Sequence, residues 1–567
     1  MEQKTNNFEE SVQNLIEEIE QRENAGILEP ANALVLKKLI RKAETVEEAS
    51  IIASLGTTYK KTGFHFDKRL EKHQMGNKIR YFRRNDELSF GEVKRGEPIN
   101  KLIIGENYYA LQNLLIQYKG GIDVIYIDPP YGMDSLRQSS ETQYENAITR
   151  DNLLSMLYFR LQLAKRLLSK DGVIFCSIDD KNYAYVKCLF DDIFEESGFV
   201  ASLIIESSVI AGPRRVPAMQ GSVVKTAEYC LAYSRSGNNK IIKNLKYDPI
   251  DGFDSHYCNW IDVANNKIIS LLDLINQTPI IKKRFELHEF KINYESLSIL
   301  VGFDEVVREW LYSEDIASNI YRKGVKENIE DRNYPYNRLF KVDNKWYVKT
   351  ESGFYNVFRY CDRIGKSDDY FNRFGERQVR GNLWKGFSSD GGNLEKEGFV
   401  SYKNGKKPLR LISQLIDSVV TREDAVILDF FAGSGTTGHA VLEINRRKSN
   451  KMTFILCQNN QITEEAPNGI ANDITCKRLK RIMTGSCYSS DARFKKPKDF
   501  EPYGGCLEVY EIDEVANNCT EEGKTAFDVI DETLYGKERF TNLRDKVEWV
   551  CSNFESTQWN EPKKDEE

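Results

Sequence analysis

A short stretch, Ile-Tyr-Ile-Asp-Pro-Pro-Tyr, carries the residues best suited to chemistry. The apolar run Val124–Ile127 predicts a buried strand, and Asp128 follows directly after it. Proline has no N–H for a sheet ladder and disfavours helix in the residue before it, so Pro129 and Pro130 predict a stiff, extended loop. Open α/β sheets bind their ligands at the carboxyl ends of their strands. We therefore expect Asp128 and Tyr131 to lie in a binding site.

The chemistry of this loop suits one kind of ligand. It offers an acceptor carboxylate on Asp128, a backbone carbonyl on Pro129 and a flat aromatic face on Tyr131. A planar ring with an exocyclic amine needs acceptors for its two N–H groups and a surface for its π-face. Taken alone, the four residues are explained equally well by a turn that ends a strand and contains a structural tyrosine.

A glycine-rich turn forms a second candidate site far downstream. The run Ala425–Phe430 predicts a strand that carries Asp429 near its end, and the turn 432–438 leads into a helix. Glycine lets backbone approach a ligand closely, and a helix N-terminus offers N–H donors and a favourable dipole. Asp429 is suited to pair with a ligand ammonium. Dinucleotide-binding proteins use similar turns, but this one lacks a Gly-Lys-Ser/Thr sequence and is shorter than the dinucleotide fingerprint.

A regular alternation of strands and helices positions both candidate sites. Before residue 237 we expect strands at 102–104, 123–128, 173–178, 199–205 and 228–233, and helices at 108–118, 152–168 and 183–194. After residue 395 we expect a helix at 409–420 and strands at 425–430 and 452–457. Gly172 stands where a helix terminator belongs. The alternation predicts an α/β protein with a doubly wound sheet.

Length and composition indicate a large globular protein. Its 567 residues correspond to three or four structural units at about 150 residues each. No signal-peptide pattern and no apolar run of ~20 residues is present, so we expect a cytoplasmic protein without membrane contact. The 11 cysteines form no CxxC pair and the 5 histidines are scattered, which predicts reduced thiols and no metal site. With a net charge of −6, contact with nucleic acid would depend on local basic surface.

The alternation breaks in the middle of the chain, where aromatic and basic residues mix. Arg373, Arg377 and Arg380 are candidate contacts to base edges or phosphates, although such a stretch is also typical of solvated surface. We divide the chain into a helical N-terminal extension (1–60), a connector (61–100), a first half of the sheet (101–236), an inserted domain (237–395), a second half of the sheet (396–460) and a C-terminal extension (461–567).

Together these motifs resemble the amino-group DNA methyltransferases, in the class whose catalytic motif precedes the cofactor motif. Residues 128–131 resemble the target-base motif, and residues 429–437 resemble the S-adenosylmethionine motif. Further matches are Asp171–Phe175, Glu228–Tyr233 and Lys407-Pro408. The resemblance is strongest to modification subunits of type III restriction–modification systems, over roughly residues 100–235 and 395–510. Relatives usually have asparagine at Gly132, and many methyltransferases have an acidic ribose ligand at Gln458, so the residue that binds the ribose stays open.

The resemblance implies a fold and a division of roles. The fold would be a circularly permuted, Rossmann-like methyltransferase sheet with an inserted α+β target-recognition domain. Asp128, Pro129, Pro130 and Tyr131 would form the catalytic loop. The cofactor S-adenosylmethionine would be bound by Asp429, Phe431, Gly433, Gly435 and Thr436.

The resemblance also implies a reaction and partners. A methyl group would pass directly to N6 of an adenine flipped out of double-stranded DNA, because aspartate at the first motif position is more typical of adenine enzymes. A homodimer and a restriction subunit with helicase and endonuclease activity are candidate partners. The alternatives are a cytosine-N4 methyltransferase, an RNA or protein methyltransferase, and a catalytically inactive DNA-binding specificity subunit.

Overall fold

The computed structural model describes residues 2–24, 28, 30–54, 58–61, 64–67, 78–130, 150–392, 394–402, 406–489, 494–516 and 524–554. The chain divides into two compact units. One unit comprises Met1–Asn244 and Asn382–Glu567, and the other comprises Leu245–Gly381. The second unit lies inside the range 237–395 that the sequence assigns to an inserted domain.

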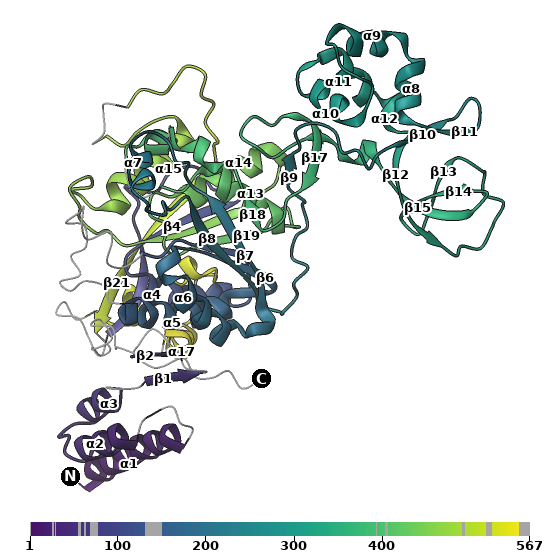
Figure 1. Cartoon of the computed structure of the whole chain (residues 1–567). Helices are drawn as coiled ribbons and strands as arrows, with labels where there is room; N and C mark the ends of the chain where they lie inside the picture. The colour runs from purple at the N-terminus through teal and green to yellow at the C-terminus, as the bar shows by residue number, and fades with distance from the viewer. Residues whose placement is uncertain are drawn as a thin grey trace. The chain divides into compact units, whose positions relative to one another are not determined.

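A ten-stranded mixed sheet forms the centre of the first unit (Figure 1). Its strands follow the order β18-β7-β8-β6-β5-β19-β20-β4-β21-β3. Strands β4, β20, β19, β5 and β6 are parallel, and β8 is antiparallel to both β6 and β7. The strand bounds are β3 (Lys78–Arg84), β4 (Ile99–Ile104), β5 (Ile122–Ile127), β6 (Leu168–Ile178), β7 (Phe199–Glu206), β8 (Ala227–Ser234), β18 (Leu383–Trp384), β19 (Val426–Asp429), β20 (Thr453–Gln458) and β21 (Cys506–Ala516).

Two sequence-distant halves of the sheet meet between β5 and β19. Ile427 and Leu428 of β19 pair in parallel with Val124 and Ile125 of β5. The strand that precedes Asp128 and the strand that ends at Asp429 are therefore neighbours, although the whole second unit separates them in the sequence. The predicted fold class, a permuted Rossmann-like sheet, is confirmed.

Helices cover both faces of this sheet (Figure 1). Along β5, Ile125 and Ile127 pack into one core, whereas Val124 and Tyr126 pack into the other. All four side chains are buried, which explains the continuous apolar run in the sequence. The first core contains α4 (Asn107–Tyr118), α5 (Arg150–Leu167), α6 (Asp180–Phe194) and α17 (Leu543–Phe554), and the second contains α13 (Leu409–Val419), α14 (Thr436–Lys448) and α15 (Lys477–Thr484).

Two strands of the sheet come from ranges that the sequence analysis assigns to a connector and to an extension. β3 falls in the expected connector 61–100, and β21 falls in the expected extension 461–567. β21 pairs in parallel with β4 and antiparallel with β3. Arg83 of β3 forms an ion pair with Asp513 of β21 at 2.8 Å. The basic residues of β3 thus belong to an edge strand with carboxylate partners.

The prediction that Gly172 ends a helix is wrong. α5 ends at Leu167, and Gly172 lies within β6. A Cβ at this position would lie 2.9 Å from Leu168 Cδ2 and 3.0 Å from the carbonyl oxygen of Ile122. A side chain at this position would be crowded by Leu168 and by the backbone of β5.

The N-terminal residues form helices, as predicted, followed by a short hairpin. The elements are α1 (Glu2–Asn24), α2 (Pro30–Ile40), α3 (Val46–Ser54), β1 (Thr58–Lys61) and β2 (Phe64–Asp67). Ile16, Ile19, Leu36 and Ile40 form a small core between the helices. Within the described ranges, no helix has both the length and the apolar character needed to cross a membrane.

The second unit has the α+β architecture that the sequence analysis expects. A six-stranded antiparallel sheet has the order β11-β10-β12-β15-β14-β13, and a smaller sheet has the order β16-β17-β9. The strands are β9 (Tyr247–Pro249), β10 (Asn259–Asp262), β11 (Lys267–Ser270), β12 (Ile320–Glu327), β13 (Leu339–Val342), β14 (Lys345–Thr350), β15 (Gly353–Arg359), β16 (Ile364–Lys366) and β17 (Phe374–Val379). The helices are α8 (Leu271–Gln277), α9 (Pro279–Leu287), α10 (Tyr294–Phe303), α11 (Glu305–Tyr312) and α12 (Glu314–Ala317).

Candidate active site

Both candidate motifs lie at one edge of the main sheet. Asp128 directly follows β5, Asp429 ends β19, and Gln458 ends β20. These strands are parallel and are hydrogen-bonded to one another in the spatial order β5-β19-β20, so their carboxyl ends meet at the same edge. The sheet therefore brings together the catalytic loop and the glycine-rich turn.

A half-buried lysine, whose side chain is 16% exposed, joins the catalytic loop to a neighbouring strand. Lys407 Nζ lies 3.4 Å from Asp128 Oδ1 and 2.8 Å from Glu228 Oε2 on β8. Burial by itself would lower the pKa of Lys407, but the two carboxylates raise it above its ordinary value. Burial likewise opposes ionisation of Glu228, yet Lys407 holds the pKa of that carboxyl below its usual range. The cluster thus fixes the Asp128 carboxylate against a permanent positive charge.

The rest of the loop is only partly described. Pro129 is buried and Pro130 is exposed, so the first proline anchors the loop in the protein. Tyr131, the expected stacking surface, lies outside the described residues, and its role stays a prediction.

The glycine-rich turn has the left-handed backbone that its glycines favour. Gly433 and Gly435 have φ values of 51° and 77°, and Gly435 is the N-cap of α14. The N–H of Gly433 donates to Gln458 Oε1 at 2.7 Å. A Cβ on Gly435 would lie 3.2 Å from Thr475 Cγ2, so the glycine is required by the positive φ and by packing behind the turn.

The start of α14 is built to receive polar ligand groups. The first N–H groups of an α-helix have no partners within the helix. Gly435 supplies no side-chain cap for them. Thr436 begins the helix and is buried, and Phe431 lies half-buried in the turn. The arrangement agrees with the binding roles predicted for these residues, which stay predictions.

Asp429 accepts hydrogen bonds from two residues of the turn. Its Oδ1 accepts a hydrogen bond from the N–H of Phe431 at 3.0 Å, and its Oδ2 accepts one from Thr437 Oγ1 at 2.5 Å. The side chain is buried, and burial raises its pKa to about 7, with a further increase from the Asp128 carboxylate. A cation bound beside it would favour its ionised form.

A fully buried arginine also contacts the turn. Arg478 of α15 donates from Nη1 to Thr436 Oγ1 at 2.8 Å and to Ser434 Oγ at 3.1 Å. Its Nη2 forms an ion pair with Glu397 at 3.0 Å. Arg478 thus ties the start of α14 to the segment that leads toward Lys407.

The sequence analysis missed part of this site. It noted the Lys407-Pro408 pair and the strand that contains Glu228, but gave neither charged residue a role. An acidic residue at the start of an otherwise apolar strand was the available signal for Glu228. The sequence offered no comparable signal for Arg478, since its partners come from two distant segments.

The three arginines proposed to contact DNA differ in the structure of the second unit. The Arg380 side chain is 1% exposed and pairs with Asp248 at 2.7 Å, which removes it from the candidate DNA contacts. Arg377 stacks on Tyr247 at 3.8 Å. Arg373 is 51% exposed although it pairs with Asp369 at 2.7 Å and with Asp251 at 3.4 Å. Arg373 and Arg377 stay predicted contacts.

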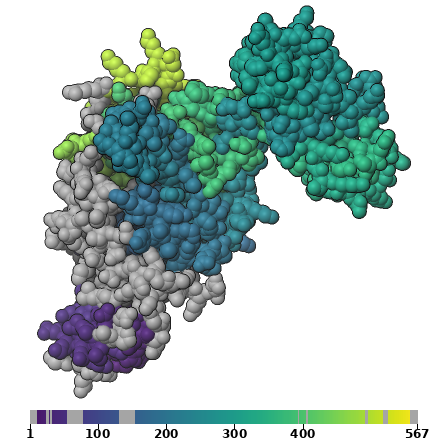
Figure 2. Space-filling view, viewed as in Figure 1, coloured from purple at the N-terminus to yellow at the C-terminus, as the bar shows by residue number. Residues whose placement is uncertain are grey.

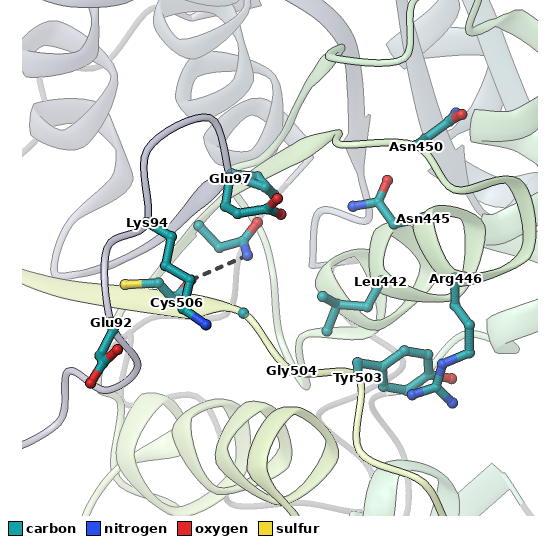
Figure 3. Close-up of a pocket in the computed structure, with 13 residues that line it drawn as sticks. Glu92, Lys94, Glu97, Leu442, Asn445, Arg446, Asn450, Tyr503, Gly504 and Cys506 are labelled. Carbon is teal, nitrogen blue, oxygen red and sulfur yellow. Dashed lines mark hydrogen bonds between the residues drawn. The ribbon is translucent and has the colours of Figure 1, made fainter.

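A separate pocket lies at the opposite edge of the main sheet (Figure 3). Its volume is about 670 Å³, and it is lined by residues that include Glu92, Glu97, Arg446 and Tyr503. Arg446 stacks over Tyr503 at 3.7 Å. The pocket contains none of the residues predicted for the catalytic or cofactor site.

The fold and site define a class of protein. A carboxylate–proline loop and a glycine-rich turn on adjacent parallel strands, in permuted order, are the architecture of a permuted methyltransferase. The sequence profile of the DNA methylase family matches residues 122–466, which is more than half of the chain. The chain belongs to this family. A family described as an uncharacterised conserved protein matches residues 11–124.

Individual relatives are similar over a large part of the chain. The probable type III restriction-modification enzyme HindVI Mod subunit of Haemophilus influenzae is 28% identical over 384 residues, which are 63% of this chain and 49% of that protein. The StyLTI Mod subunit of Salmonella typhimurium is 26% identical, over 68% of this chain and 57% of its own length. The type II methyltransferase M.KpnI of Klebsiella pneumoniae is 26% identical, over 73% of this chain and 94% of its own length. The chain spans about half the length of the two Mod subunits.

Proposed function

We propose that this protein methylates N6 of a specific adenine in duplex DNA with S-adenosylmethionine, as the modification subunit of a type III restriction–modification system. The proximity of the Asp128 loop to the glycine-rich turn supports this proposal most strongly. Methyl transfer from a cofactor to an amine requires an amine-binding site and a cofactor site side by side, and adjacent parallel strands provide that arrangement.

The residues of the turn fit the proposed cofactor. The uncapped start of α14 provides N–H donors for a carboxylate, and Asp429 is suited to an ammonium. The glycines keep the backbone free of side chains on this surface. When bound, S-adenosylmethionine supplies an electrophilic methyl group attached to a positively charged sulfur. Gln458 already accepts a hydrogen bond from the turn, so it holds the turn in shape whichever residue binds the ribose.

The catalytic loop acts on the amine. Flipping the target nucleotide costs a few kcal/mol, and stacking on Tyr131 would return about 1–3 kcal/mol. Asp128 and the Pro129 carbonyl accept the two N–H groups, which draws the nitrogen lone pair out of conjugation with the ring. The proton that the nitrogen loses on methylation passes to an Asp128 oxygen. Asp128 is 27% exposed, so solvent can remove this proton. Positioned acceptors carry most of the rate enhancement.

Lys407 is a positioning residue in this scheme. Its ammonium pairs with Asp128 and Glu228 at once, so the acceptor keeps one direction before the base arrives. Fixing an acceptor in advance avoids a cost of reorganisation during the reaction.

The proposal also specifies the target base and the partner subunit. Asp128 at the first motif position and the similarity to Mod subunits favour adenine N6 and a type III system with a restriction subunit. The similarity to M.KpnI, a type II methyltransferase, favours as second candidate an enzyme that acts without such a subunit. The composition and the family agree with action in the cytoplasm.

Direct sequencing of modified bases tests the proposal. DNA from a host that expresses the chain should contain N6-methyladenine at one short motif, on one strand only for a type III enzyme. A matched host that expresses Asp128→Ala should lack the mark. N4-methylcytosine would transfer the assignment to a cytosine enzyme. DNA binding without any modification would support an inactive specificity subunit.

A further inference from the structure

One surface segment, residues 207–226, differs in character from the chain around it. It contains Arg214, Arg215 and Lys225 but no acidic residue, in a chain with a net charge of −6. Each of its residues is exposed or half-buried. Met219 is 80% exposed and Val223 is 101% exposed. Val209, Ile210 and Val216 are exposed as well.

The topology places this segment beside the catalytic loop. β7 runs parallel to β6 and ends at Glu206, and β8 starts at Ala227, so both ends of the segment lie at the edge that carries Asp128. The N–H groups of Ser207 and Ser208 donate to the carbonyl oxygen of Thr226 at 3.0 and 3.2 Å. These bonds close the base of the segment. Glu228, the partner of Lys407, follows two residues later.

The segment has a defined shape and accessible charges. It contains the short helix α7 (Arg215–Met219), which lies on the surface of the first unit (Figure 1, Figure 2). Pro213 and Pro217 restrict its backbone. Neither Arg214 nor Arg215 forms an ion pair with any residue that the structure describes. Lys225 pairs with Asp180 at 3.4 Å and fixes the base of the segment to α6.

We propose that the 207–226 segment is a DNA clamp that stabilises the flipped state of the target nucleotide. Arg214 and Arg215 bind backbone phosphates, and Met219 with Val223 enters the duplex where the flipped base has left a gap. Arginine–phosphate contacts position proteins on DNA, and proteins that distort a duplex insert apolar side chains between base steps. Positive charge, exposed apolar side chains and a place at the catalytic edge favour this partner. The inference rests on the proposed function.

Matched variants of the full chain test the clamp. Arg214→Gln/Arg215→Gln is compared with Lys94→Gln/Arg95→Gln, which removes two basic residues from the opposite edge of the sheet. Binding of a fluorescent random-sequence duplex is measured by anisotropy over a range of salt concentrations. Loss of two phosphate contacts should make the slope of log K against log salt shallower by about 1.8. The control variant should keep the wild-type slope.

The role of the exposed apolar side chains is tested by measuring methyl transfer. Met219→Ser/Val223→Ser should lower kcat/KM for unmethylated genomic DNA at least about tenfold, because unstacking a base step costs a few kcal/mol. Its calorimetric affinity for S-adenosylmethionine and its melting temperature should match wild type. Val93→Ser changes a valine that is 56% exposed at the opposite edge, and it should have no effect.

The outcomes separate this inference from the proposed function. If wild type transfers no methyl group to DNA, the proposed function fails, while the salt slopes still decide whether the arginines bind duplex. Wild-type slopes and turnover in both segment variants would overturn the clamp. Weaker self-association in sedimentation without any change in DNA binding would also overturn it, by identifying the segment as a contact between two copies.

Discussion

The pKa of about 7 at Asp429 leads to a pH-dependent affinity for the cofactor. Burial of this carboxyl, reinforced by Asp128, leaves about half of the ligand-free molecules protonated near neutral pH. If a cationic ligand binds only the ionised form, affinity should fall about tenfold between pH 8 and pH 6. Binding should release protons, and most of them at the lower pH. The raised pKa of Asp429 also affects the stability of the ligand-free protein. The folded state holds the Asp429 proton more tightly than the unfolded state does. The free energy of unfolding should therefore fall as pH rises from about 4 to about 7.

Isothermal calorimetry with S-adenosylmethionine at pH 6, 7 and 8 measures this effect, and two buffers of different ionisation enthalpy count the protons released. Asp429→Asn is the matched control, since it keeps the size of the side chain and reports the titration of the ligand's own amino group. The ratio of the two affinities should change about tenfold over this range. Asp128→Asn should move the midpoint to lower pH because it removes the neighbouring negative charge. Equal pH dependence in wild type and Asp429→Asn would refute the reasoning.

Substitutions at five positions test the site and the second unit. Asp128→Ala should abolish methyl transfer in a tritium assay while calorimetric affinity for the cofactor survives, and near-normal transfer would contradict the mechanism. Lys407→Met should cost about 1–3 kcal/mol of stability in denaturant titrations, because two half-buried carboxylates lose their shared partner. Lys407→Arg should recover part of this loss. Gly435→Val should lower the melting temperature and cofactor affinity, since its positive φ disfavours a branched residue by more than about 1 kcal/mol; unchanged values would show that the turn tolerates it. Arg380→Ala should destabilise the protein without altering the DNA motif that it methylates. Arg373→Ala should alter that motif or the salt dependence of DNA binding, while stability stays at the wild-type value. The reverse result would contradict the argument from the burial of Arg380.

The sequence allowed the central strands and the main motifs to be predicted because their information is local. Val124–Ile127 is apolar on both faces since the strand is covered on both faces, and Gly433 and Gly435 mark a turn through their own backbone preference. β3 could not be found in this way. Its arginines look like solvent-exposed charges until their carboxylate partners on β21 are known, and those partners lie more than 400 residues away in the sequence.

The sequence did not predict the charged contacts of the site for a related reason. Lys407 acquires its role only when β8 and the loop after β5 bring Glu228 and Asp128 to it. Arg380 shows the converse error, because a basic residue among aromatics looked exposed and is buried against an aspartate. Gly172 was misinterpreted because the local sequence is the same whether a glycine ends a helix or lies in a strand that packs closely against its neighbour.

The pairing of β5 with β19 has a consequence for how the chain is made. During synthesis the ribosome releases β5 first and β19 only after Leu245–Gly381 has emerged, so the catalytic edge cannot close until the second unit is complete. Such distant strand pairs form slowly. Their equilibrium cost, however, grows only with the logarithm of the intervening length, by about 0.6 kcal/mol for each doubling. Inserted units of quite different sizes can therefore be exchanged between the same two strands during evolution while the sheet and its chemistry persist.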